Sequence, residues 1–146
     1  MRLDHRGGGA LAVLTLAAGI AAAAIHVGLA DTPAGKGQTV TPAFAYDLPH
    51  LPGQKVTGVL VEYAPGASSP PHHHTSEGAV VAYVLEGAIR SQVNDGPEKV
   101  YQAGESWLEP PGAAHSISAN ASTTEPARLL AIFVAADGAE LTTFDR

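Results

Sequence analysis

The chain has 146 residues, no cysteine and a formal net charge of −6. This length favours one domain with a core of its own. The absence of cysteine excludes disulfides, thiolate metal sites and a cysteine nucleophile. The eight Lys and Arg residues are scattered along the chain, which argues against a nucleic-acid-binding groove.

The first 30 residues have the layout of a secretory signal. Arg2 and Arg6 precede an apolar run over residues 10–25, and small residues follow up to Ala30. This run is shorter than the ~20 residues of a membrane span. We therefore expect residues 1–30 to be cleaved and the mature protein to be periplasmic or extracellular, with no stable membrane span. An uncleaved N-terminal anchor is the alternative.

Residues 31–54 are rich in Pro, Gly and Thr and show no sustained periodicity. We expect an extended N-terminal arm that carries one short edge strand near residues 39–45. From residue 55 to 146, apolar runs of a few residues alternate with turn signals, and no window offers a clean helical stripe. This part of the chain is predicted to be an all-β barrel or sandwich.

The expected strands follow one another at short intervals. The Asn94-Asp95-Gly96 sequence is a strong hairpin signal between two of them. Trp107 and Leu108 are neighbours on one expected strand, so one of them should face the core. Arg90 is expected on the outer face by alternation with its neighbours. Tyr83 shares a strand face with Val81 and Leu85. We expect Tyr83 either to line the barrel or to be a buried structural residue. The apolar runs cover residues 56–64, 79–87, 88–93, 115–119 and 127–135.

Three adjacent histidines, His72, His73 and His74, precede one of these runs. Residues two apart on a strand share a face, so His72 and His74 point together while His73 points away. Two imidazoles at that spacing can bind one metal ion through bonds of ~2.0–2.1 Å. A third ligand must come from elsewhere, and His115 follows a Pro-Pro-Gly turn at the start of another strand. We therefore predict a metal site of His72, His74 and His115.

These residues give the chain a resemblance to the cupin family of small β-barrels, over about residues 54–135. The first cupin motif, G-x5-H-x-H-x3–4-E-x6-G, resembles the segment from Gly66 to Gly87. The second, G-x5-P-x-G-x2-H-x3-N, resembles the segment that begins at Gly104 and includes His115. The resemblance implies a jelly-roll barrel (a double-stranded β-helix), a divalent metal ion (Fe, Mn, Zn or Ni) and a small-molecule ligand or substrate. It also implies a homodimer formed through the N-terminal arm.

Two positions depart from the family pattern. Val80 stands where the first motif has its glutamate, and one extra residue separates it from His74. The asparagine of the second motif falls on Ala119, with Asn120 one residue later. Three alternatives follow for the missing carboxylate. In the first, Glu77 folds back from its loop to bind the metal. In the second, water completes a site of three histidines, and in the third no metal binds tightly. A solvated loop position is the usual one for a glutamate such as Glu77.

The sequence supports three classes of function. The first is an exported, metal-dependent protein that acts on a small organic molecule. The second is a non-catalytic barrel that binds a small ligand or a partner protein, with weak metal binding or none. The third is a structural role without a ligand. No catalytic residue is identified, although Glu77 is the nearest candidate for a general base.

Overall fold

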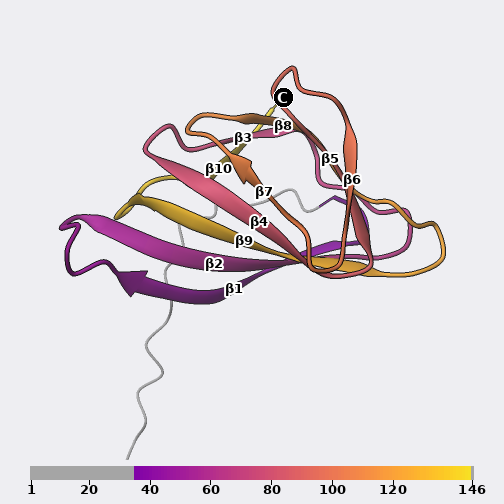
Figure 1. The fold of residues 1–146 in the computed structure, drawn as a ribbon, viewed down its shortest axis with the longest axis horizontal. Coiled ribbons are helices and arrows are strands. Elements are labelled where there is room, and N and C mark those ends of the chain that lie inside the picture. Colours follow the sequence, from indigo (N-terminus) through magenta and orange to yellow (C-terminus); the bar gives the residue numbers. More distant parts are fainter. Residues whose placement is uncertain (1–34, 146) are drawn as a thin grey trace, which may run out of the picture.

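The computed structural model describes residues 35–145, a range that contains ten strands and no helix (Figure 1). None of these residues forms a helix able to cross a membrane. The predicted signal segment, residues 1–30, lies outside the described residues, so the division at residues 30 and 54 stays a prediction. The strands are β1 (Gln38–Asp47), β2 (Gln54–Tyr63), β3 (His72–His74), β4 (Gly78–Glu86), β5 (Ala88–Val93), β6 (Lys99–Gln102), β7 (Ser106–Glu109), β8 (Ala114–Asn120), β9 (Ala127–Ala136) and β10 (Thr142–Phe144).

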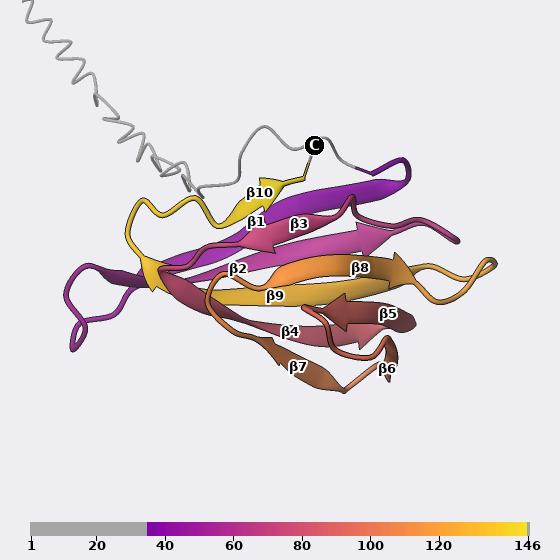
Figure 2. The ribbon, with the colours of Figure 1, turned by 90° about the horizontal axis from the view of Figure 1, so that it is seen from above.

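The strands form two antiparallel sheets of five strands each. The first sheet has the order β1-β2-β9-β4-β7, and the second has the order β10-β3-β8-β5-β6. Figure 2, viewed from above, shows strands of the second sheet lying over strands of the first, for example β8 over β9. The prediction of an all-β jelly-roll barrel is confirmed.

The core lies between the two sheets and follows the two-residue alternation of the strands. In β4, Val80, Ala82 and Val84 are buried, whereas Tyr83 between them is 41% exposed. The expectation that Tyr83 lines the barrel or is buried was therefore wrong. Its strand face was identified correctly, but that face is the outer one. Of the neighbours Trp107 and Leu108, one of which was expected to face the core, Trp107 is buried and Leu108 is exposed.

The strand expected near residues 39–45 is present as β1 at the edge of the first sheet. It pairs with β2 over most of its length, from Gln38 to Asp47, with one irregularity after Pro42. The predicted hairpin also forms, because β5 pairs with β6 and Asn94 adopts a left-handed backbone with φ of 51°.

Two strand pairings position the candidate site residues. In the second sheet, His72 on β3 lies directly opposite His115 on β8. In the first sheet, Val80 on β4 lies directly opposite Glu109 on β7. Because the sheets face each other, these two pairs approach one another across the core.

Candidate metal centre

The structure brings the three predicted histidines together. His72, His74 and His115 are buried, and one ring nitrogen of each lies within 4.8 Å of the other two. The ring centroid of His72 is 4.9 Å from that of His74 and 5.0 Å from that of His115. This proximity follows from the fold, since His74 is two residues along β3 and His115 is the cross-strand partner of His72.

Hydrogen bonds fix the orientation of each imidazole. The Nδ1–H groups of His72 and His74 donate to the carbonyl oxygens of Pro70 and Leu141, at 2.8 and 3.2 Å. These bonds leave the Nε2 lone pair of both rings free to bind a cation. His115 uses Nε2 instead to contact Ser91 Oγ at 2.9 Å, which leaves its Nδ1 for the cluster.

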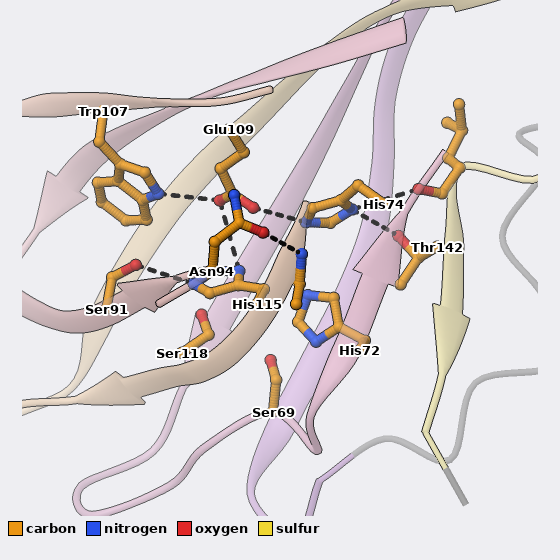
Figure 3. A network of polar contacts seen from close by, with 12 residues as sticks. Ser69, His72, His74, Ser91, Asn94, Trp107, Glu109, His115, Ser118 and Thr142 are labelled. Atoms are coloured by element: carbon orange, nitrogen blue, oxygen red, sulfur yellow. Dashed lines mark hydrogen bonds and ion pairs between the residues drawn. The ribbon is translucent and has the colours of Figure 1, made fainter. Parts of the chain in front are cut away.

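A fourth residue, Glu109, belongs to this cluster although the sequence reasoning did not single it out. Its side chain is almost fully buried, with 1% exposed. Glu109 Oε2 is 3.0 Å from His74 Nε2, and Oε1 is 3.4 Å from His115 Nδ1. The indole N–H of Trp107 donates to Oε1 at 2.9 Å. Figure 3 shows the Glu109 carboxylate between Trp107 on one side and His74 on the other.

The signal that could have found Glu109 is strand alternation. Either Trp107 or Leu108 was expected to face the core, and Glu109 follows Trp107 by two residues on the same strand. A strand that turns Trp107 inward must also turn Glu109 inward.

The charges of the cluster follow from burial and contact. Burial, followed by the neighbouring His74, lowers the pKa of His72 to about 4. Burial also lowers the pKa of His115, despite the nearby Glu109. Burial raises the pKa of Glu109, but His74, His115 and the Trp107 N–H outweigh it and hold this pKa below its ordinary value. Near neutral pH, the carboxylate is therefore ionised while His72 and His115 are neutral.

The other histidines and the loop glutamate lie away from the centre. His73 is exposed, and its Nδ1 is 2.7 Å from Asp145 Oδ1. His50 is exposed in a turn. Glu77 is exposed in the loop before β4 and is therefore the solvated charge that was expected by default, not a replacement for the missing carboxylate.

Asn120 is buried and has a structural role at the end of β8. Its Nδ2 donates to the carbonyl oxygens of Ala64 and Glu125, at 3.1 and 2.8 Å, and its Oδ1 accepts from the backbone N–H of Ser122. These bonds tie the loop after β8 to the end of β2. The second motif's asparagine position is thus shifted by one residue, to a side chain that holds loops together.

A cavity of ≈ 60 Å³ adjoins the cluster. Its walls are mostly apolar, with Val59, Leu129 and Phe133 among the lining residues. A polar patch lies in the same cavity, where Tyr63 OH is 2.7 Å from Ser69 Oγ and 2.8 Å from Ser118 Oγ. A small apolar cavity with a few polar groups is typical of a site for a small organic molecule.

The donor set fits a divalent metal ion. Glu109 Oε2 is the one buried side-chain polar atom among residues 35–145 that has no hydrogen-bond partner. With the ring proton of His74 on Nδ1, as its bond to the Leu141 carbonyl requires, His74 Nε2 presents a lone pair to this oxygen at 3.0 Å. A cation surrounded by imidazole nitrogens would satisfy this oxygen, and imidazole suits Zn, Cu, Fe and Ni.

Comparisons with known proteins point to one family. The model of the family described as "Cupin domain" matches residues 59–133, more than half of the chain. A germin-like protein (subfamily 2 member 2) of Arabidopsis thaliana is 34% identical over 101 residues, which are 66% of this chain and 45% of that protein. The chain thus spans less than half the length of this curated relative.

Solved structures share the fold. Oxalate oxidase in complex with the substrate analogue glycolate matches with a TM-score of 0.59 at 23% identity, covering 80% of this chain and 59% of that one. The polyketide cyclase RemF from Streptomyces resistomycificus matches with a TM-score of 0.54 at 24% identity, covering 73% of this chain and 75% of that one. At these identities the likeness concerns the fold alone.

The lowered pKa of His72 predicts how the stability of metal-free protein depends on pH. In the unfolded chain His72 takes up a proton at its ordinary pKa of 6.5, whereas in the folded protein its pKa is about 4. The unfolded state therefore binds more protons in this window, and stability falls as the pH drops through it. We expect His72 to contribute a loss of about 2 kcal/mol between pH 7.5 and pH 5.

Urea unfolding with chelator present measures this effect. The matched variant is His72→Gln, which should show a smaller loss of unfolding free energy between the two pH values. Equal losses in the wild type and His72→Gln would contradict the burial of a neutral His72.

Proposed function

The chain belongs to the cupin family, and on that premise we propose that it binds one divalent metal ion through His72, His74 and His115. The observation that carries this proposal is the convergence of three buried imidazoles, from two strands of one sheet, on a single point beside a buried anion. Without a cation, the cluster would hold an ionised carboxylate in a low-dielectric interior, which is costly.

We further propose that a small organic molecule binds in the adjoining cavity and contacts the bound metal. The size of the cavity and its apolar walls favour a ligand of few atoms. A glycolate complex of oxalate oxidase, a protein of the same fold, supports a small molecule with oxygen donors as the class to test first. A divalent metal in such a site acts as a Lewis acid that polarises a bound oxygen.

The chain's own residues would prepare this site. His72 and His115 are neutral near pH 7, as metal ligands must be, and their carbonyl and hydroxyl partners hold the ring orientation. The apolar walls exclude bulk water from the ligand. The hydroxyl of Tyr63, with the two serines it contacts, offers hydrogen bonds to polar atoms of a ligand.

Metal analysis of protein purified without chelator tests the metal proposal. We expect close to one metal ion per chain in the wild type and a large loss in the double variant His72→Ala plus His115→Ala. The control is His73→Ala, because His73 lies in the same histidine run but is exposed and faces away. Equal, substoichiometric metal in all three proteins would show that the cluster is not a metal site.

We also propose that the protein is exported, on the strength of the basic, apolar and small-residue segments of residues 1–30. The expected result is a mature protein in the periplasmic or extracellular fraction that begins at residue 31. N-terminal sequencing measures this directly. A cytoplasmic protein that retains Met1 would contradict the proposal.

A homodimer in which the N-terminal arm takes part has support from the outer face of the first sheet. Tyr46 on β1, Val81 and Tyr83 on β4, Leu108 on β7 and Val134 on β9 are all 41% or more exposed. Val81 lies directly opposite Leu108, so these side chains form part of one surface. Contiguous exposed apolar surface on a sheet is typical of a protein interface.

Sedimentation velocity tests this dimer. We expect the wild type to sediment as a dimer and Leu108→Glu to sediment as a monomer, because a charge in the centre of an apolar interface opposes association. The control is Val100→Glu, which places the same charge at a half-exposed valine of β6 in the other sheet. A wild-type monomer at micromolar concentration would contradict the proposal.

A further inference from the structure

We infer that Glu109 is a fourth metal ligand and that it supplies from β7 the carboxylate that the cupin pattern supplies from β4. This inference rests on the proposed metal site. It assigns a ligand that lies outside the first motif, at the residue just before the Pro-Pro-Gly turn of the second.

Strand register places the two positions side by side. Val80, which stands at the family's glutamate position, is the cross-strand partner of Glu109. Side chains directly opposite each other on antiparallel strands share a face, and their Cβ atoms lie only about 5 Å apart. Both residues are 1% exposed and both line the cavity beside the histidines. A carboxylate on either strand can therefore reach the same point.

The two carboxylate oxygens of Glu109 have different surroundings. Glu109 Oε1 accepts the indole N–H of Trp107 at 2.9 Å, which holds the carboxylate in place. Glu109 Oε2 accepts no hydrogen bond from residues 35–145, although it lies 3.0 Å from His74 Nε2. One oxygen is thus anchored, and the other is directed at the cluster without a donor. This is the arrangement that a monodentate metal ligand requires.

Among residues 35–145, the basic side chains within ion-pair distance of Glu109 are His74, at 3.0 Å, and His115, at 3.4 Å, and no lysine or arginine lies that close. Buried carboxylates are paired with a cation or coordinate a metal ion. A divalent ion bound by three neutral imidazoles and Glu109 leaves a net charge of +1 at the centre, which attracts an anionic oxygen ligand.

A simpler role for Glu109 is a structural contact to the imidazoles alone. The two roles make different predictions for Glu109→Gln, which preserves the shape of the side chain and its acceptor for Trp107 but removes the charge. A structural contact affects folding stability, whereas a metal ligand affects metal affinity.

Zinc titration of chelator-treated, full-length protein separates them, with affinity measured by competition with a chromophoric chelator. We expect one zinc ion per wild-type chain and an affinity at least about tenfold lower in Glu109→Gln. The matched control is Glu77→Gln, which removes an exposed carboxylate three residues after His74 and should bind zinc as the wild type does.

The exchange variant Val80→Glu plus Glu109→Val tests the equivalence of the two positions. It returns the carboxylate to β4 and keeps the total charge, so we expect zinc affinity to recover most of the loss seen in Glu109→Gln. Trp107 is the one tryptophan of the chain, so its emission reports on its contact with Glu109. Zinc should change this emission in the wild type and have a much smaller effect in the exchange variant.

Each outcome decides between the proposals. Wild-type affinity in Glu109→Gln, with one zinc ion bound, would overturn the role of Glu109 and leave the three-histidine site standing. No zinc binding by the wild type would overturn both. A folded exchange variant that binds no better than Glu109→Gln would overturn the equivalence of Val80 and Glu109.

Discussion

A carboxylate buried among three imidazoles is the interaction on which the functional site depends. Glu109 has almost no contact with solvent, and the basic side chains within ion-pair distance of it among residues 35–145 are His74 and His115 alone. An ionised carboxylate in such a place needs positive charge nearby, because solvation by water is lost. A bound cation would therefore stabilise this centre, and the proposed ligand cavity lies directly beside it.

The fold creates this centre through strand register rather than through a local loop. Antiparallel pairing places His115 opposite His72 and Glu109 opposite Val80, each pair on an inward face. The packing of the two sheets then brings the three histidines of the second sheet against the Glu109 carboxylate of the first. Because a one-residue slip would turn every one of these side chains outward, the register that buries the core also assembles the site.

The sequence was informative wherever two-residue alternation could be combined with a motif. The spacing of His72 and His74 predicted a shared face, and the second motif supplied His115; the structure places all three together. The same alternation could not decide which face of β4 was the inner one, because both faces are apolar in sequence. As a result, the side of the sheet that Tyr83 occupies was predicted wrongly.

Glu109 was missed for a different reason. The search for the missing carboxylate stayed within the first motif, between His74 and Gly87. The pairing of β4 with β7 is a long-range property that no local pattern reveals, although the parity of Trp107 and Glu109 on β7 was visible in the sequence. A substitution at one strand position can be offset by a residue directly across the sheet, and a motif read along one segment does not reveal it.

The most direct test of a four-residue metal centre is a crystal structure of the metal-loaded protein, with anomalous diffraction recorded at the absorption edge of the bound metal. We predict one anomalous peak at about 2.0–2.2 Å from a ring nitrogen of His72, His74 and His115 and from one oxygen of Glu109. A peak bound by the histidines alone, with Glu109 still held only by Trp107 and the imidazoles, would contradict the fourth ligand. A peak elsewhere in the molecule would contradict the metal centre itself.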